Sequence, residues 1–133
     1  MATESGLQRV LVVESDPGYR IDLCRVLSDQ GHVVASVAGG DDALALLDHF
    51  APTVVVCELA ATASGMTLVR TIRDHAASRD VPILVLGDAD HAAAMEQLFE
   101  LGQVRYLRRG ADPETFQRTF ATLLEWAEVG LGA

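Results

Sequence analysis

The sequence predicts an α/β domain in which a parallel β-sheet carries helices on both faces. Five short apolar runs alternate in strict order with longer stretches of helical periodicity. The runs at 10–13 and 81–86 are apolar throughout, as in parallel strands that are buried on both faces. The chain has 133 residues and is 50% hydrophobic, which suffices for one domain with its own core. We therefore expect a single domain over 1–133, with its core at about 8–127.

The five predicted strands coincide with the apolar runs. The runs are rich in Val, Leu or Ile, and turn residues such as Gly, Pro or Asp stand near their ends. A helical pattern follows each run, so right-handed crossovers would make all five strands parallel. The predicted strands span residues 10–13, 32–37, 53–57, 81–86 and 105–107.

The predicted helices are delimited by capping residues. Asp16-Pro17 and Asp112-Pro113 are typical helix starts, in which the aspartate caps and the proline lies in the first turn. Gly31 is suited to end the first helix, Asp41 is expected to cap the second, and the fourth is expected over 89–101. The residues predicted to face the core are Leu23, Val26, Leu27, Leu44, Leu47, Phe50, Leu68, Val69, Ile72, Met95, Leu98, Phe99, Phe116, Phe120, Leu123 and Leu124.

The charge balance argues against binding to nucleic acids or anionic membranes. The net charge is −9 at pH 7, whereas phosphate neutralisation requires clustered cations. All cations are arginines, and the chain has no lysine. No apolar run approaches the ~18 residues of a membrane span, and residues 1–8 lack a signal-peptide pattern. We therefore expect a cytoplasmic protein in which Cys24 and Cys57 are reduced core thiols.

Polar residues cluster where the predicted strands end. In a parallel sheet, ligand chemistry is expected beyond the carboxyl ends of the strands, near the point where the strand order reverses. The convergence of carboxylates and a guanidinium there predicts a functional site at this edge. The residues are Glu14, Ser15 and Asp16 after the first strand, Glu58 after the third, Gly87 and Asp88 after the fourth, and Arg108 and Arg109 after the fifth.

Five segments resemble the receiver domain of bacterial response regulators, in that family's order and spacing. They are VLVVESDPGYR, PTVVVCEL, GMTLVRTIR, VPILVLGD and YLRRGADPETF. The resemblance covers about residues 8–127. It implies a flavodoxin-like (βα)5 fold with strand order 2-1-3-4-5 and a role in two-component signal transduction.

The resemblance also implies a role for each position at the sheet edge. In the family, an acidic pair and an aspartate bind Mg²⁺, and the aspartate accepts a phosphoryl group from a histidine kinase. A Thr or Ser and a Lys contact the phosphoryl oxygens, and an aromatic residue reports the state. By position, Glu14 and Ser15 correspond to the acidic pair, Glu58 to the acceptor, Gly87 to the Thr or Ser, Tyr106 to the aromatic residue and Arg109 to the Lys.

None of the five polar positions carries the family's usual residue, which argues against efficient phosphorylation. Glu58 is one methylene longer than Asp, and a misplacement of about 1 Å can reduce a rate about 10²-fold. Ser15 removes a charge from the metal cage, and Gly87 removes a hydroxyl donor. We therefore expect no phosphoryl transfer and little or no Mg²⁺ binding, with Glu14 and Glu58 as weak candidate ligands.

Glu58 is predicted to act as a built-in substitute for a phosphorylated aspartate. Aspartate outnumbers glutamate in this chain, so composition does not explain the glutamate. Arg109 is expected to pair with Glu58 or Glu14. The alternative is an exposed Glu58 carboxylate without a role. Tyr106 is interpreted as a half-buried strand residue, with a conformational switch as the alternative. Its ring is predicted to lie over Gly87, where no side chain competes for the space, unless the loop after the fourth strand closes over Gly87 and pushes the ring out.

Other candidate residues have simpler explanations. Cys57 is either a redox thiol or a buried strand cysteine, and we favour the latter. The alanine run at 92–94 fits a flat docking face or a tightly packed helix. The histidines have no ligand spacing and are expected at the surface; they are His32, His49, His75 and His91.

Three functional hypotheses follow. The leading one is a degenerate receiver that binds a partner protein without a phosphorylation cycle, through the helix at 89–101, the strand at 105–107 and the last helix. The second is a working phosphoacceptor receiver that uses Glu58 or Asp88. The third is a small α/β enzyme or nucleotide-binding domain, which ranks last because the sequence has no P-loop, G-x-G-x-x-G or nucleophile–base pair.

Overall fold

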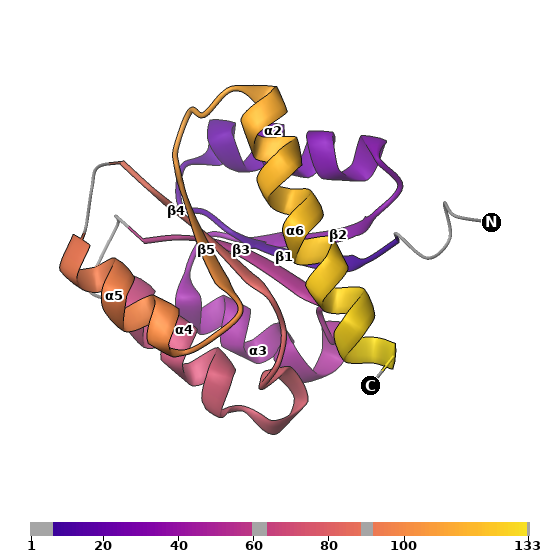
Figure 1. Ribbon diagram of the computed structural model, residues 1–133. Helices are drawn as coiled ribbons and strands as arrows, with labels where there is room; N and C mark the ends of the chain where they lie inside the picture. The colour runs from indigo at the N-terminus through magenta and orange to yellow at the C-terminus, as the bar shows by residue number, and fades with distance from the viewer. Residues whose placement is uncertain (1–6, 60–63, 89–91, 133) are drawn as a thin grey trace.

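The computed structural model shows a five-stranded parallel sheet between two layers of helices (Figure 1). It describes residues 7–59, 64–88 and 92–132. Neighbouring strands pair in the order β2-β1-β3-β4-β5, which confirms the predicted fold class and strand order. The strands are β1 (Arg9–Val13), β2 (Val33–Val37), β3 (Val54–Glu58), β4 (Ile83–Gly87) and β5 (Val104–Arg108).

The helices cover both faces of this sheet. α2 and α6 lie on one face, and α3, α4 and α5 lie on the other (Figure 1). Among the described residues, no helix combines the length and the apolar character that crossing a bilayer requires. The helices are α2 (Pro17–Asp29), α3 (Gly40–Phe50), α4 (Ser64–Asp74), α5 (Ala92–Glu100) and α6 (Pro113–Gly132), with a short 3-10 helix η1 (Ala76–Ser78) after α4.

The core consists of two apolar clusters, one on each face of the sheet. Successive side chains of a strand point to opposite faces, so the same strands supply both clusters. Leu11 and Val55 pack toward α3, α4 and α5, whereas Val12 and Val56 pack toward α2 and α6. All four side chains are fully buried, which explains why these strands appear in the sequence as unbroken apolar runs.

Two of the three predicted aspartate caps are present. Asp16 and Asp112 each accept a backbone hydrogen bond from the first turn of their helices, as predicted. The prediction that Asp41 caps α3 is wrong, because α3 begins at Gly40 and Gly39 occupies the cap position without a side-chain hydrogen bond. Asp41 lies instead in the first turn, where its charge is favourable to the helix dipole.

Three residues predicted to face the core are exposed instead. They are Val26, Leu44 and Phe99, and each is adjacent in sequence to a fully buried residue. Because one residue turns an α-helix by about 100°, a neighbour of a buried residue can point away from the packed face, as these three do. The side chains of residues 92–95, including Met95 and the alanine run, lie outside the described residues, as do His91 and the segment 60–63.

His32 is buried, which corrects its predicted surface position. Its ring packs edge-on against Phe120, with the ring centroids 5.6 Å apart. The ring Nδ1 accepts a hydrogen bond of 3.1 Å from the backbone N–H of Gln8. Burial lowers the pKa of His32, so the neutral form fits this position.

Arg73 joins three segments at the amino edge of the sheet. It lies at the end of α4, and its guanidinium donates to the carbonyl oxygens of Val81 at 2.6 Å and of Gly102 at 2.7 Å. Longer bonds reach the carbonyls of Leu101 and Gln103. Val81 and Gln103 lead into β4 and β5, so one side chain ties the beginnings of both strands to α4.

Candidate functional site

The predicted site residues lie at the carboxyl edge of the sheet. Glu14 directly follows β1, and Arg109 directly follows β5. Glu58 and Gly87 are the last residues of β3 and β4, one residue within the strands rather than beyond them. Val13 of β1 is paired in register with Cys57 of β3, so Glu14 and Glu58 are brought to adjacent positions.

Glu14 is a buried carboxyl with 1% of its surface exposed. Its Oε2 accepts a hydrogen bond from the backbone N–H of Asp16 at 3.0 Å and lies 3.0 Å from Nη2 of Arg109. Its Oε1 is buried and has no hydrogen-bond partner among the residues that the structure describes. Burial raises the pKa of Glu14, and the Glu58 carboxylate raises it further, while the Asp16 N–H and the Arg109 guanidinium oppose the shift.

Glu58 is buried to a similar degree and is engaged on both oxygens. Its Oε1 accepts a hydrogen bond of 2.7 Å from the backbone N–H of Ser15, and its Oε2 lies 3.7 Å from Nη1 of Arg109. With 8% of its surface exposed, Glu58 is not the exposed carboxylate of the alternative interpretation. The Ser15 side chain is exposed, and its backbone N–H makes the contact with Glu58.

Arg109 lies at the centre of the site. Besides Glu14 and Glu58, the side chains of Asp16 and Asp88 lie 3.8 and 3.7 Å from its guanidinium. The guanidinium also lies over the ring of Tyr19, 4.7 Å from the ring centroid. The expected pairing of Arg109 with an acidic residue is therefore present, and it extends to four carboxylates rather than one.

Tyr106 lies over Gly87, in the arrangement expected from the sequence. A Cβ atom built on Gly87 would lie 2.8 Å from Cε1 and 2.9 Å from Cζ of Tyr106, closer than carbon atoms pack. The ring therefore fills the space that any side chain at position 87 would need. The tyrosine is half-buried and packs against the apolar cluster beneath α3, α4 and α5.

Cys57 lies beneath Glu58 as a buried strand cysteine. Burial, with a further contribution from the Glu58 charge, raises the pKa of the Cys57 thiol to about 12. A thiolate is the reactive form of cysteine, so this environment disfavours redox chemistry. The favoured interpretation of Cys57 as a core residue is thus supported.

Two residues of the site were not singled out from the sequence. Tyr19 and Arg20 lie in the first turn of α2. The Tyr19 ring lies against the Arg109 guanidinium, and the Arg20 guanidinium donates a hydrogen bond of 2.7 Å to the Glu14 carbonyl oxygen. The sequence signal was their position shortly after the Asp16 cap, which directs the start of α2 toward the carboxyl edge of the sheet.

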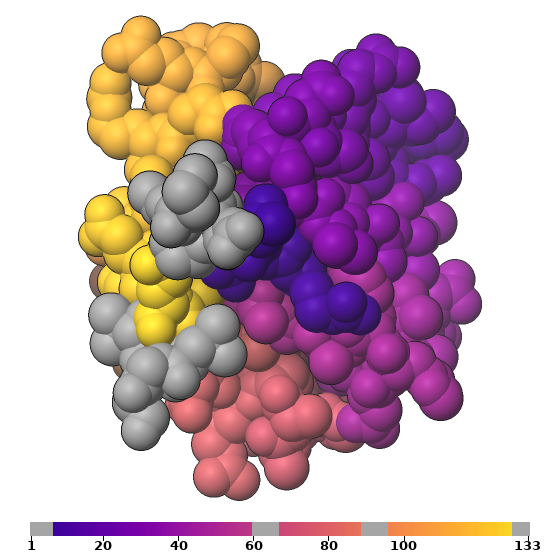
Figure 2. Space-filling model, turned by 90° about the vertical axis from the view of Figure 1, so that its right-hand side faces the viewer, coloured from indigo at the N-terminus to yellow at the C-terminus, as the bar shows by residue number. Residues whose placement is uncertain are grey.

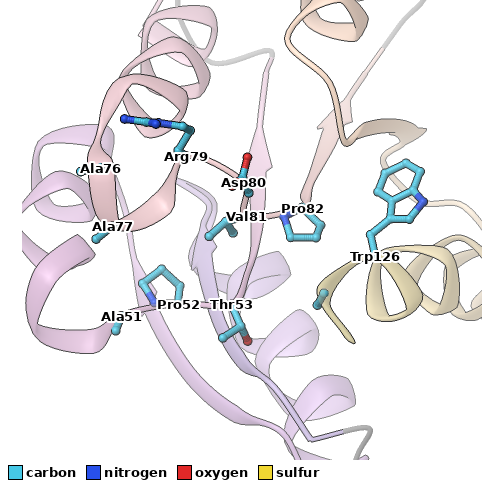
Figure 3. A pocket seen from close by; sticks show the side chains of 11 residues that line it. Ala51, Pro52, Thr53, Ala76, Ala77, Arg79, Asp80, Val81, Pro82 and Trp126 are labelled. Atoms are coloured by element: carbon cyan, nitrogen blue, oxygen red, sulfur yellow. The ribbon is translucent and has the colours of Figure 1, made fainter. Parts of the chain in front are cut away.

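Two hollows lie outside the charged cluster. A groove of about 150 Å³ runs between α2 and the start of α6. These two segments lie side by side at the top of Figure 2. Tyr19 lines this groove and also contacts Arg109 in the site. A larger hollow of about 340 Å³ lies at the opposite edge of the sheet, between the segments that precede β3 and β4 and Trp126 of α6 (Figure 3). The larger hollow is therefore separate from the site.

Comparison with known families identifies the class of this domain. Residues 10–121 match the response regulator receiver domain. Together with the strand order and the position of the site, this match shows that the chain belongs to the receiver domain family of two-component signalling.

Individual relatives are distant. The chain is 24% identical over 119 residues to protein PilH of Pseudomonas aeruginosa. The matched region covers 89% of this chain and 98% of PilH. The chain is 29% identical over 96 residues to the regulator of RpoS of Escherichia coli. This matched region covers 71% of this chain and 28% of that protein.

Solved structures agree on the fold. Chemotaxis protein CheY4 of Vibrio cholerae superposes with a TM-score of 0.80 at 24% identity, over 88% of this chain and 98% of that one. A second structure is the receiver domain of sensor histidine kinase PA1611 of Pseudomonas aeruginosa, which has a magnesium ion coordinated in its active site cleft. It superposes with a TM-score of 0.76 at 23% identity, over 89% of this chain and 98% of that one.

Proposed function

We propose that this receiver domain regulates by binding a partner protein, without accepting a phosphoryl group. The observation that carries the proposal is the state of Glu58 at the acceptor position. The carboxylate is buried, one oxygen is bonded to the Ser15 N–H, and the other faces Arg109. Phosphoryl transfer requires an acceptor oxygen that can attack in line with the donor, and the contacts of both Glu58 oxygens argue against that role.

The contacts around Glu58 favour one fixed arrangement of the site. Glu58 carries one negative charge where a phosphorylated aspartate carries about two, and Arg109 meets that charge. Tyr106 occupies the space over Gly87. In this proposal the domain holds a single signalling state, and its output depends on whether the partner is present.

The partner surface that we propose comprises α5, β5 and α6, which meet at the β5 edge of the sheet (Figure 1). Phe99 of α5 is exposed, and the Arg105 guanidinium of β5 lies over the ring of Trp126 of α6 at 4.6 Å. Aromatic residues and arginine contribute most of the binding energy at many protein interfaces. The net charge of −9 favours a protein partner over nucleic acid or an anionic membrane.

The test is incubation with acetyl phosphate and Mg²⁺ followed by intact-mass measurement. We expect no mass gain, while a receiver domain with an aspartate acceptor, treated in parallel, gains one phosphoryl group. A gain in this protein that disappears in Glu58→Gln would overturn the proposal. A gain that persists in Glu58→Gln and disappears in Asp88→Asn would also overturn it, in favour of a phosphoacceptor at Asp88.

A further inference from the structure

The guanidinium of Arg109 is surrounded by carboxylates from three different strand ends. Its Nη2 lies 3.0 Å from Glu14 and 3.8 Å from Asp16, and its Nη1 lies 3.7 Å from both Glu58 and Asp88. The Glu14 and Glu58 side chains are almost fully buried, whereas those of Asp16 and Asp88 are exposed. One internal cation thus faces four acidic groups.

Arg109 is held in this position from several sides. Its backbone N–H donates to the carbonyl oxygen of Gly87 at 2.8 Å, which fixes its Cα against the end of β4. Tyr19 lies against one face of the guanidinium, and only 19% of the Arg109 side chain is exposed. The planar fork presents Nη1 to Glu58 and Nη2 to Glu14 at the same time, whereas a lysine would offer both carboxylates a single nitrogen.

The same oxygens do not fit the magnesium ion that the receiver family implies. Mg²⁺ requires near-octahedral oxygen ligands at about 2.0–2.1 Å. Oε1 of Glu58 is bonded to the Ser15 N–H, and Oε2 of Glu14 is shared between the Asp16 N–H and Arg109. Within the described part of the chain, no group of three or more His, Cys, Asp or Glu side chains is arranged to hold a metal ion. A fixed positive charge among these oxygens also repels a second cation.

We propose that the Arg109 guanidinium takes the place of the divalent cation, so that the acidic site is neutralised from within the chain and is independent of Mg²⁺. This inference extends the proposed function. The two can fail separately, because a domain that accepts no phosphoryl group can still bind Mg²⁺. The physical expectation is that removing the guanidinium leaves four carboxylates without their central cation and thereby creates affinity for a divalent metal.

The test compares metal binding by the wild type, Arg109→Gln and Arg108→Ala. Arg108→Ala is the matched control, since it removes an equal charge from the adjacent residue, whose exposed guanidinium donates to the Asp88 carbonyl oxygen at 3.5 Å. Mg²⁺ and Mn²⁺ are titrated by calorimetry at pH 8, where the raised pKa of Glu14 interferes least. Mn²⁺ broadening of the Ser15 and Asp16 amide resonances then locates any bound ion.

We expect no saturable binding to the wild type or to Arg108→Ala at low millimolar metal. Arg109→Gln should bind at least about tenfold more tightly, which corresponds to the loss of about 1.4 kcal/mol of repulsion. Millimolar Mg²⁺ should also raise the melting temperature of Arg109→Gln alone. Arg109→Lys keeps the charge without the planar fork and serves as the second variant if Arg109→Gln does not fold. Arg109→Lys should bind metal more tightly than the wild type and, where both variants fold, more weakly than Arg109→Gln.

Two results would overturn the inference. One is wild-type binding of Mg²⁺ at this edge, with broadening of the Ser15 and Asp16 amides by Mn²⁺. The other is a folded Arg109→Gln protein, or a folded Arg109→Lys protein in its place, that gains no more affinity for either metal than Arg108→Ala does.

Discussion

Alanine at position 87 should force the Tyr106 ring out of its place. The new Cβ would lie 2.8 Å from Cε1 of Tyr106, whereas carbon atoms pack at about 3.5 Å or more, so the ring must retreat by about 0.7 Å or rotate away. The strand offers little relief, because the Gly87 carbonyl is bonded to the Arg109 N–H and β4 is paired on both sides.

The expected loss of stability follows from two opposing effects. Overpacking costs about 1–3 kcal/mol, and the lower conformational entropy of unfolded alanine returns about 0.5–1 kcal/mol. We therefore expect Gly87→Ala to lower the free energy of unfolding in urea by up to about 2.5 kcal/mol, with about 1 kcal/mol near the middle of this range. The chain has two tyrosines, so ¹³C-labelled tyrosine spectra can follow the Tyr106 ring directly.

Two further variants isolate the contact. Gly40→Ala is the control glycine, since its Cβ would meet nothing closer than Leu68 at 4.0 Å; it should be neutral or stabilising by up to about 1 kcal/mol. In a Tyr106→Ala background, the cost of Gly87→Ala should disappear. If Gly87→Ala is as stable as the wild type and the Tyr106 resonances do not move, the ring does not occupy the space over Gly87.

Three other predictions concern the core. Burial lowers the pKa of His32, so the unfolded chain takes up the proton first as the pH falls. The free energy of unfolding should therefore fall as the pH drops below about 6.5. His32→Phe should lessen this pH dependence, whereas replacement of the exposed His49 should not. Brief iodoacetamide treatment of the folded protein should modify Cys24 before Cys57, as peptide mass mapping can show, because Cys57 is buried and its pKa is raised to about 12. Phe120→Ala should cost about 3–5 kcal/mol in urea denaturation, and a cost below 1 kcal/mol would contradict its place in the core.

The sheet could be predicted from the sequence because its central strands are buried on both faces. Val10 to Val13 are apolar for that reason. A helical stretch lies between each pair of successive runs, as in the crossover connections that join parallel strands. The position of Glu14 and Glu58 at one edge followed from the same topology. The exposed positions of Val26 and Phe99 did not, because adjacent residues of an amphipathic helix are equally apolar in sequence and only the packing separates them.

The contacts within the site depend on tertiary geometry that no local pattern encodes. The hydrogen bond from the Ser15 N–H to Glu58 requires the register between β1 and β3. The stacking of Tyr19 on Arg109 joins residues 90 positions apart, from the start of α2 and the end of β5. The sequence predicted that Arg109 would meet one acidic residue. That it lies among four results from three strand ends meeting at a single edge.

The carbonyl contacts of Arg73 clamp the amino ends of β4 and β5 to α4. The guanidinium fixes the segments that enter both strands, so those ends cannot separate from α4 without breaking several hydrogen bonds. Each strand is five residues long, about 16 Å, so this clamp lies one strand length from the opposite ends, which carry Gly87 and lead into Arg109. The placement of Gly87 and Arg109 therefore rests in part on a side chain that lies at the other edge of the sheet.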